Sequence, residues 1–246
     1  MAKKHIVVLS GAGVSAESGI STFRDSKGLW EQYDVMQVAS IDGWYVNPAL
    51  IQKFYNERRA QLNTVEPNEG HHIIASLEKD FRVTVVTQNV DNLHERAGST
   101  NVIHLHGELT KACNESKTQV IDIGLRPIAE GEKAADGSRL RPFIVWFGEA
   151  VPLIDEAARS VQSADIVIIV GTSMQVYPAA GLIHYTKPHT PIYLVDPAEV
   201  SVGSHVKVIK EKASKGMAIV RDELVISAQN PPESPPKPAS PTSKPD

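Results

Sequence analysis

Short apolar runs rich in β-branched residues alternate along the chain with longer stretches of helical periodicity. Several runs are apolar almost throughout, which is typical of strands buried on both faces of a parallel sheet. The runs predict strands at His5–Leu9, Arg82–Thr87, Val102–Leu105, Phe143–Trp146, Asp165–Val170 and Ile192–Val195. The periodic stretches predict helices at Pro48–Leu62, Asn68–Lys79, Leu153–Ser163, Pro178–Tyr185 and Lys212–Leu224. This alternation predicts an α/β fold, a doubly wound parallel sheet with ligand sites at the carboxyl ends of its strands.

Two segments interrupt the alternation. Residues 26–62 are mostly helical in pattern, and residues 110–142 are rich in glycine and charge. We interpret both as insertions that form a smaller lobe within a domain of residues 1–229. Residues 230–246 contain seven of the sixteen prolines and no aromatic or aliphatic β-branched residue. Such a segment cannot bury enough apolar surface to fold, so we predict a disordered proline-rich tail.

Composition limits the classes of partner. The 246 residues are 41% hydrophobic and 22% charged, and 25 basic against 29 acidic residues give a net charge of −4. This balance does not favour nucleic acid or anionic membranes. The apolar run Ile6–Leu9 is too short for a signal-peptide core or a membrane span. Because the single Cys113 also excludes an internal disulfide framework, we predict a cytoplasmic protein.

A glycine-rich loop follows the first predicted strand. Gly11 and Gly13 allow a tight turn that brings backbone N–H groups against a phosphate. The next glycine is Gly19, so the GxGxxG pattern of redox dehydrogenases is not met. The loop is compatible with a nucleotide phosphate site and also with a plain strand–helix turn.

Two further strands end in polar residues. Gln88, Asn89 and Asp91 follow the second strand, where carboxamides and a carboxylate suit ribose hydroxyls and a nicotinamide amide. Helix N-capping by Asn89 or Asp91 explains the same residues equally well. Another buried strand runs into Gly171, Thr172 and Ser173. Repetition of this arrangement at several strand ends is what a dinucleotide cleft requires.

A histidine pair closes another short strand. In His104-Leu105-His106-Gly107, strand alternation places His104 and His106 on one face. A histidine at a strand exit is well placed as a general base near neutral pH. A structural histidine with satisfied hydrogen bonds is the alternative.

Five motifs in this order resemble those of the sirtuins, the Sir2 family of NAD-dependent protein-lysine deacylases. They are GAGVSAESGISTFRD (11–25), TQNVDNLHERAG (87–98), HLHG (104–107), FGEAVP (147–152) and VGTSMQVYPAAG (170–181). The resemblance covers nearly all of residues 5–225. It implies a Rossmann-like large domain and a small lobe with a helical and a zinc module, and the two insertions fall where that lobe is built.

The resemblance also implies roles for individual residues. The chain would contact NAD, consumed as a co-substrate, through Gly11, Ala12, Gly13, Thr22, Phe23, Arg24, Trp30, Gln88, Gly171, Thr172 and Ser173. Asn89 and Asp91 would line the ribose and nicotinamide pocket. His106 would be the catalytic base and Asn89 a second catalytic residue. Adenine-side contacts would come from Val195, Asp196 and Ala213.

In the reaction that the resemblance implies, the acyl-lysine carbonyl oxygen attacks the nicotinamide ribose, and His106 then takes a proton from the ribose hydroxyls. Nicotinamide, O-acyl-ADP-ribose and free lysine are the products. The substrate strand would add to the segment that contains Val145, Phe147, Gly148 and Glu149, a β-augmentation that recognises backbone more than sequence.

Two residues narrow the acyl group. Tyr55 and Arg58 are three apart and share a face of the predicted helix. This Y-x-x-R pattern resembles that of the class III sirtuins, which remove succinyl and malonyl groups. Ala39 resembles the small residue that widens their acyl pocket. A surface arginine beside a core tyrosine is the alternative.

The zinc ligands of the family are missing. Most members carry two Cys-x-x-Cys pairs, whereas here Cys113 stands alone and Ser116 occupies the next position. One thiolate cannot hold a structural zinc, so we expect no metal. We expect packing to order the lobe instead, through Ile121, Ile123, Leu125, Ile128 and Leu140.

Two other functions would use the same cleft, NAD hydrolysis or ADP-ribosyl transfer, and non-catalytic NAD binding. Phe147–Glu149 and the acyl-pocket residues favour deacylation over the first, and His106, Asn89 and Asp91 argue against the second. The expected partners are acyl-lysine proteins, with neither nucleic acid nor a membrane.

Overall fold

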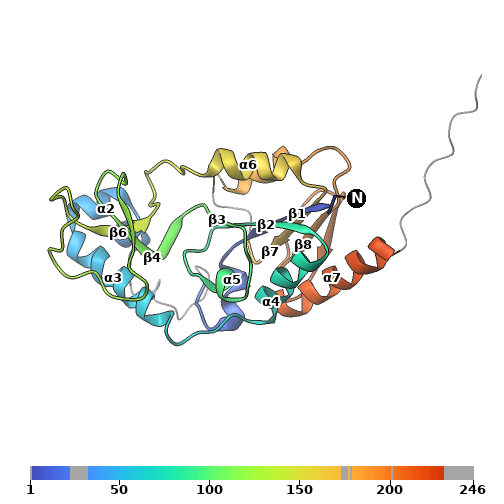
Figure 1. The fold of residues 1–246 in the computed structure, drawn as a ribbon, viewed down its shortest axis with the longest axis horizontal. Coiled ribbons are helices and arrows are strands. Elements are labelled where there is room, and N and C mark those ends of the chain that lie inside the picture. Colours follow the sequence, from blue (N-terminus) through green and yellow to red (C-terminus); the bar gives the residue numbers. More distant parts are fainter. Residues whose placement is uncertain (1, 23–32, 173–176, 178, 201, 230–246) are drawn as a thin grey trace, which may run out of the picture.

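The computed structural model describes residues 2–22, 33–172, 177, 179–200 and 202–229. The predicted tail at 230–246 lies outside these residues, as do four predicted cofactor contacts: Phe23, Arg24, Trp30 and Ser173. Figure 1 shows a large lobe built on one sheet and a small lobe at the other end of the molecule. In the described part of the chain, no helix is both long and apolar enough to cross a membrane.

The large lobe contains a parallel sheet in the strand order β3-β2-β1-β7-β8-β9. Its strands are β1 (His5–Ser10), β2 (Arg82–Thr87), β3 (Val102–His104), β7 (Ile166–Val170), β8 (Ile192–Val195) and β9 (Val206–Ile209). β1 and β7 are buried along their whole length, which explains their apolar sequences. The strand order reverses direction between β1 and β7, and ligands bind at such a switch point in open α/β sheets.

Helices cover both faces of this sheet. One face packs against α4 (Glu69–Ser76) and α7 (Ala213–Gln229), and the other against α6 (Ile154–Ser163) and a 3-10 helix at Ala179–Tyr185. In Figure 1, α6 lies above the sheet, with α4 and α7 below it. Shorter elements complete the lobe: 3-10 helices at Ala12–Val14, Ala16–Ser18 and Leu77–Lys79, and α5 (Leu93–Arg96). The predicted doubly wound fold is confirmed.

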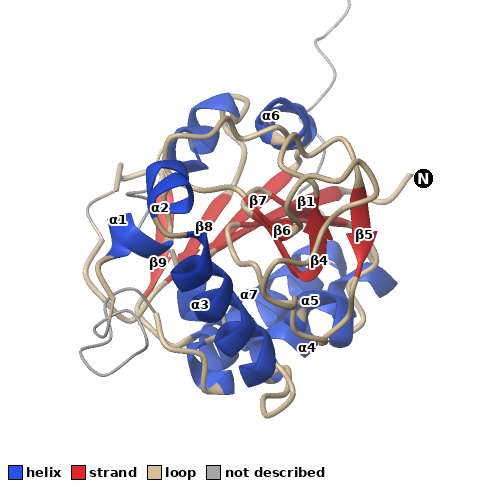
Figure 2. Cartoon of the chain, turned by 90° about the vertical axis from the view of Figure 1, so that its left-hand side faces the viewer, coloured by secondary structure: helices blue, strands red, loops and turns tan. Residues whose placement is uncertain are grey.

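The small lobe joins helices to an antiparallel sheet of order β5-β4-β6 (Figure 2). Its elements are α1 (Val35–Val38), α2 (Ile41–Val46), α3 (Pro48–Gln61), β4 (Gly107–Cys113), β5 (Val120–Asp122) and β6 (Arg141–Ile144). A buried cluster joins the helices to the sheet; it includes Trp44, Phe54, Tyr55, Leu109, Ile144 and Trp146. These elements overlap both predicted insertions.

Several predicted elements need correction. The strand predicted at Phe143–Trp146 is Arg141–Ile144, and it pairs antiparallel with β4 instead of joining the parallel sheet. β4, β5 and β9 were not predicted, because their polar and apolar residues do not form a recognisable apolar run. β3 ends at His104, so Leu105 and His106 lie in a turn and strand alternation does not relate the two histidines.

The region of the missing zinc ligands is ordered by packing. Ile123, Ile128 and Leu140 form a buried cluster with Ala112, as predicted. Ile121 is 44% exposed, so its predicted place in that packing is wrong. Leu125 packs against the larger helical cluster instead.

Cys113 is fully buried, and its Sγ lies 3.9 Å from the Pro142 carbonyl oxygen. Burial raises the pKa of this thiol to about 11. A thiol in that state is a poor metal ligand, since metals bind the thiolate. Within the described ranges, no group of three or more His, Cys, Asp or Glu side chains could hold a metal ion.

We therefore predict a protein that does not depend on zinc, because Cys113 lacks the three partners that a structural site needs. Elemental analysis of tag-free protein should give well under one zinc per chain. Treatment with a chelator should leave the melting temperature and the activity unchanged. Stoichiometric zinc would contradict this and indicate an unconventional ligand set.

Candidate functional site

The loops after β1, β2 and β7 meet at the carboxyl end of the large sheet. Gly11 N–H donates to the Val170 carbonyl at 3.1 Å, and Gly13 N–H donates to the Gly171 carbonyl at 2.8 Å. The Gln88 Nε2 donates to Thr172 Oγ1 at 3.1 Å. Three of the sequence motifs thus meet at the switch point. We call the connected loop residues Gly11–Gly13, Gln88 and Gly171–Thr172 the rim.

Glycine is required where the first and last of these loops touch. Gly171 has φ +61°, and a Cβ there would lie 2.2 Å from the Val14 nitrogen. A Cβ on Gly11 would lie 2.7 Å from Thr172 Cβ. The N–H groups of Gly11 and Gly13 bond to the facing loop, so other backbone N–H groups of the turn would have to face a phosphate. The two glycines shape the rim by letting the loops approach each other.

A buried hydrogen-bond chain orients Asn89 and Asp91. Asn89 Nδ2 donates to Ser15 Oγ at 3.1 Å, and Ser15 Oγ donates to Asp91 Oδ2 at 3.0 Å. Asp91 Oδ1 accepts from the Leu93 N–H at 3.1 Å, at the start of α5. One carboxylate oxygen thus bonds to the first residue of α5, although the N-cap position is Asn92, and the other bonds to Ser15. The expected place of Asp91 in a ribose and nicotinamide pocket stays a prediction. Burial raises the pKa of Asp91, against the hydrogen bonds from Leu93 and Ser15.

Ser15 and His71 belong to this network and were not predicted. His71 Nδ1 accepts from the Asn68 N–H at 3.3 Å in the capping box of α4, so its proton is on Nε2, 3.5 Å from Ser15 Oγ. Burial lowers the pKa of His71 to about 4, which keeps the ring neutral. The position of Ser15 directly after the glycine loop was a usable signal. His71 is far away in sequence, and only the fold brings it to Ser15.

The two histidines of the HLHG motif have different environments. His104 Nδ1 bonds to the Asn89 carbonyl at 3.0 Å and its Nε2 to Glu95 Oε1 at 2.7 Å. Although burial opposes the charge, Glu95 raises the pKa of His104. With both ring nitrogens engaged, His104 is a structural residue.

His106 keeps one ring nitrogen for chemistry. Its Nδ1 lies 3.1 Å from the Gln88 carbonyl oxygen. A carbonyl only accepts, so Nδ1 carries the proton and Nε2 retains its lone pair. Burial lowers the pKa of His106, partly offset by the bond to Gln88. A neutral imidazole with an available Nε2 is the form that a general base requires.

A second cluster of predicted residues lies where the small lobe meets this cleft. Tyr55 on α3 is 3% exposed and packs against Trp146, with ring centroids 6.1 Å apart. Burial raises the pKa of Tyr55 to about 12, against the charge of Arg58, so the hydroxyl stays a donor. Burial lowers the pKa of Arg58, and the charges of Tyr55 and Asp91 oppose that shift. Arg58 therefore interacts electrostatically with both Tyr55 and Asp91.

The predicted substrate segment is attached to this cluster through its backbone. Phe147 N–H donates to the Ala39 carbonyl at 2.9 Å, and Ile41 N–H donates to the Phe147 carbonyl at 3.0 Å. Val145 N–H donates to the His106 carbonyl at 2.9 Å. These bonds bring Ala39, the predicted pocket-widening residue, next to the segment. Glu149 differs from its neighbours because its side chain bonds to Arg141 and Lys117 of the lobe itself.

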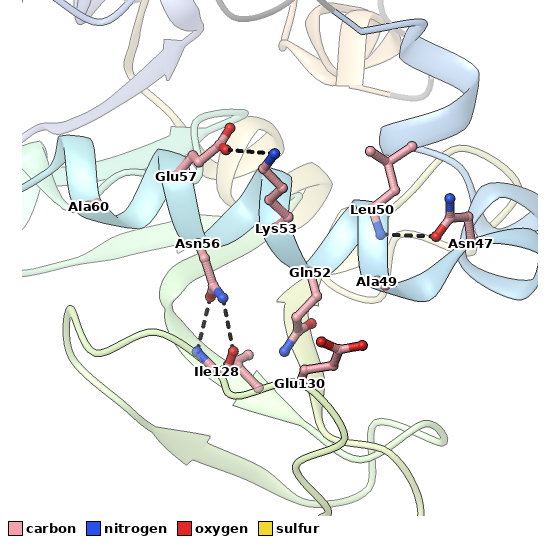
Figure 3. A pocket seen from close by; sticks show the side chains of 10 residues that line it. All are labelled: Asn47, Ala49, Leu50, Gln52, Lys53, Asn56, Glu57, Ala60, Ile128 and Glu130. Atoms are coloured by element: carbon pink, nitrogen blue, oxygen red, sulfur yellow. Dashed lines mark hydrogen bonds and ion pairs between the residues drawn. The ribbon is translucent and has the colours of Figure 1, made fainter.

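The outer face of α3 carries a separate cavity of about 760 Å³ (Figure 3). Asn56 lines this cavity, and its side-chain amide donates to the Ile128 carbonyl and accepts from the Ile128 N–H. Lys53 and Glu57 form an exposed ion pair on the same face. None of the predicted site residues lines this cavity. The residues predicted to contact adenine do not line this cavity either. Val195 and Asp196 lie at the end of β8, and Ala213 lies at the start of α7.

The Sir2 family model matches residues 11–178. The chain belongs to the Sir2 family. It is 52% identical over 235 residues to the NAD-dependent protein deacylase of Bacteroides thetaiotaomicron, covering 90% of this chain and 98% of that one. It is 48% identical over 224 residues to the NAD-dependent protein deacylase of Helicobacter pylori, covering 90% and 98%.

Solved structures of the family agree with this assignment. A crystal structure of a Sir2 homologue in complex with NAD superposes with a TM-score of 0.82 at 37% identity, over 92% of this chain and 91% of that one. The protein is accordingly an NAD-dependent protein deacylase that uses NAD as a co-substrate. The prediction of this fold and activity from the five motifs is confirmed.

We predict that His106→Ala abolishes O-acyl-ADP-ribose formation without abolishing NAD binding, since the lost group is a proton acceptor. General bases contribute on the order of 10²–10⁴-fold, and turnover should fall by at least that lower figure. Calorimetry should give an NAD affinity close to that of the wild type. His72→Ala, which removes an exposed histidine of α4, is the control. Near-wild-type turnover of His106→Ala would disprove the assignment.

The acid side of the pH profile should report the same group. A general base must be neutral, so we expect activity to require neutral His106, and burial lowers the pKa of His106 below the usual 6.5. More than half of the molecules therefore carry the active form at pH 6.5. Wild-type kcat/KM, measured between about pH 5 and 9, should retain more than half of its plateau at that pH. An acid midpoint above 6.5 would contradict the environment assigned to His106.

Proposed function

We propose that this deacylase removes acidic acyl groups, succinyl and malonyl, from protein lysines in preference to acetyl. The observation that carries the proposal is the pair Tyr55 and Arg58 on the inner side of α3, where Arg58 interacts with the cleft residue Asp91. A carboxylate at the acyl terminus would accept charge-assisted hydrogen bonds from Arg58 and one from the Tyr55 hydroxyl. Ala39 leaves space for the longer chain because it has only a methyl side chain.

We further propose that the rim at the switch point binds NAD. Ala12 and Thr22 would contact it from the loop after β1, Gln88 from the loop after β2, and Thr172 from the loop after β7. The polar rim where three parallel strands end supports this, because dinucleotides bind at that position in open α/β sheets. Phe23, Arg24, Trp30 and Ser173 complete the proposed set from the sequence alone. When bound, NAD supplies the ribosyl carbon that receives the acyl oxygen while nicotinamide leaves.

The chain's own contribution to the chemistry is proton transfer and orientation. His106 would accept a proton at Nε2, since Nδ1–H is held by the Gln88 carbonyl. Asn89 directs its Nδ2 toward Ser15, so its side-chain Oδ1 would accept a hydrogen bond from the bound reactants. Asp91 would line the nicotinamide side.

The acyl-lysine strand would pair with the segment Val145–Gly148. The N–H groups of Val145 and Phe147 already bond to His106 and Ala39, so the substrate would use the remaining backbone groups around Gly148. Gly148 has φ +90°, and a Cβ there would lie 2.8 Å from the Ile41 side chain. A glycine at this position lets the segment approach Ile41 closely in a left-handed backbone conformation.

A cytoplasmic location belongs to the same proposal. The net charge of −4 and the single, buried cysteine support a protein whose partners are acylated proteins rather than nucleic acid or membranes.

Arg58→Met tests the acyl preference, because it keeps the apolar stem and removes the charge. If half of two charge-assisted hydrogen bonds survives screening, about 2 kcal/mol is lost for the acidic substrate. The ratio of kcat/KM for succinyl-lysine over acetyl-lysine peptides should then fall about thirtyfold. Tyr55→Phe removes one hydroxyl and should shift the ratio the same way by less.

The control is Lys53→Met on the outer face of α3, where the side chain is 68% exposed and the ratio should not change. Taking the ratio cancels any change in NAD binding. An equal loss of both activities in Arg58→Met would make the pair structural and the acyl assignment wrong.

A further inference from the structure

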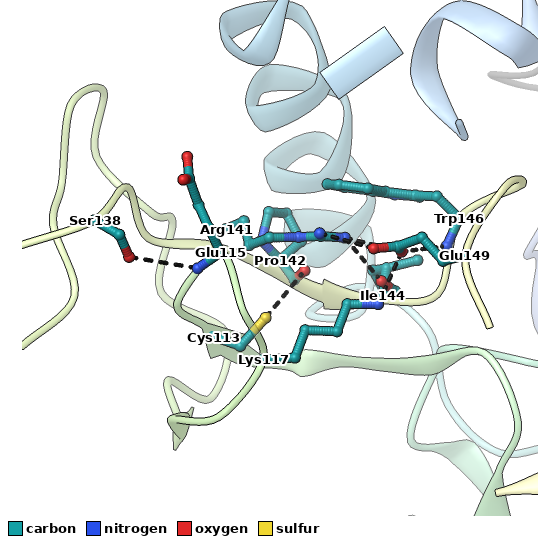
Figure 4. A network of polar contacts seen from close by, with 9 residues as sticks. All are labelled: Cys113, Glu115, Lys117, Ser138, Arg141, Pro142, Ile144, Trp146 and Glu149. Carbon is teal, nitrogen blue, oxygen red and sulfur yellow. Dashed lines mark hydrogen bonds and ion pairs between the residues drawn. The ribbon is translucent and has the colours of Figure 1, made fainter. Parts of the chain in front are cut away.

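Glu149 lies at the centre of a shielded ion network in the small lobe (Figure 4). Its Oε1 accepts from Arg141 Nη1 at 2.9 Å, and its Oε2 accepts from Arg141 Nη2 at 3.1 Å and Lys117 Nζ at 2.8 Å. Arg141 is 1% exposed, and the Glu149 side chain is 13% exposed. A bidentate pair of this kind fixes the relative orientation of two planar groups.

The network anchors the predicted substrate segment from three directions. Arg141 lies on β6, opposite Cys113 of β4, and Lys117 lies in the turn between β4 and β5. Glu149 Oε2 also accepts from the Trp146 N–H at 2.9 Å, which closes the turn at Trp146–Glu149. These bonds tie the antiparallel sheet, at the position of Cys113, to the predicted substrate segment.

Arg141 also fixes the ring of Trp146. Its guanidinium carbon lies 3.6 Å from the Trp146 ring centroid and 5.8 Å from that of Trp44. Figure 4 shows the Trp146 indole lying along the guanidinium plane. Arginine suits this position because one planar cation can stack on an aromatic face and pair with a carboxylate in its plane.

Trp146 also contacts the proposed acyl-pocket residues. Its ring packs against Tyr55, and the next residue, Phe147, bonds to the backbone of Ala39. The Trp146 ring also packs against Trp44, with ring centroids 5.3 Å apart. The guanidinium stack links the orientation of this ring to the Arg141–Glu149 pair.

We propose that Arg141, through Glu149 and Trp146, is a positioning residue for the acyl-lysine substrate. It contacts neither substrate nor NAD, and it holds Val145–Gly148 and the Tyr55 wall of the pocket in register with the cleft. The proposal rests on the proposed placement of the acyl-lysine between Ala39, Tyr55 and that segment. In this lobe, where one cysteine cannot hold a metal, the buried ion pair performs the anchoring.

Arg141→Met is the first test. Displacement of binding groups by about 1 Å costs on the order of 100-fold, so the KM for an acyl-lysine peptide should rise at least about tenfold. The affinity for NAD, measured by calorimetry, should stay within about twofold, because the rim at the switch point does not touch this network. Arg141→Lys keeps the charge without the fork and should give an intermediate KM.

The double variant Arg141→Met with Glu149→Leu separates positioning from stability. Removing one partner of a buried ion pair leaves an unpaired charge and lowers stability. Replacing both partners by apolar groups leaves no such charge and is often neutral for stability. Its melting temperature should recover relative to Arg141→Met while the peptide KM stays high. Arg126→Met, which breaks the more exposed pair with Glu132 in the same lobe, is the matched control and should leave both constants unchanged.

An unchanged peptide KM in folded Arg141→Met or in the double variant would overturn the proposal, as would an equal loss of NAD affinity. Acetyl and succinyl peptides are both measured. If the wild type deacylates acetyl and succinyl peptides equally well, only the proposed acyl preference is refuted. The peptide KM of the Arg141 variants would still decide the role of Arg141.

Discussion

The pairing of β1 between β2 and β7 is the constraint on which the site depends. Because all three strands are parallel, their carboxyl ends meet on one edge, and the loops that follow them must pack against one another. The bond from Gly13 N–H to the Gly171 carbonyl exists only because neither loop carries a side chain at the contact. This contact fixes the edge of the sheet at which the polar residues of the β2 loop also lie, since Gln88 bonds to Thr172 there.

The hydrogen-bond partners of the buried polar groups, more than their residue types, determine which atoms remain available to a ligand. His104 and His106 bond to the neighbouring carbonyls of Asn89 and Gln88. Glu95 occupies the second nitrogen of His104, whereas His106 keeps its Nε2. One charged neighbour thus separates a histidine with both ring nitrogens bonded from the proposed base. Ser15 acts similarly, since accepting from Asn89 and donating to Asp91 fixes the orientation of both.

The small lobe achieves order by burial and charge together. Apolar residues of the segment between β5 and β6 close over Ala112, and the Arg141–Glu149 pair connects the sheet to Trp146. Buried ion pairs are costly to desolvate and contribute little net stability, but they are directional. Directional bonds are what the proposed substrate segment would need, because its backbone would have to match that of an incoming strand.

Local sequence determined the large sheet. Runs such as those of β1, β2 and β7 are apolar because both faces are buried, so their pattern alone predicts parallel strands. The glycine loop, the Gln88–Asp91 cluster and the HLHG motif were found for the same reason, since each directly follows such a strand. β4, β5 and β9 escaped prediction because their residues face partly toward solvent and polar neighbours, which removes the apolar run. Only the tertiary structure decided which histidine keeps a lone pair, that His71 reaches Ser15, and that Glu149 pairs with Arg141. His71 and Ser15 are 56 residues apart, and the roles of the histidines depend on which ring atom is already bonded. Glu149 and Arg141 are close in the chain, but they meet only because the segment after β6 turns back on that strand. None of these properties is written in a local pattern.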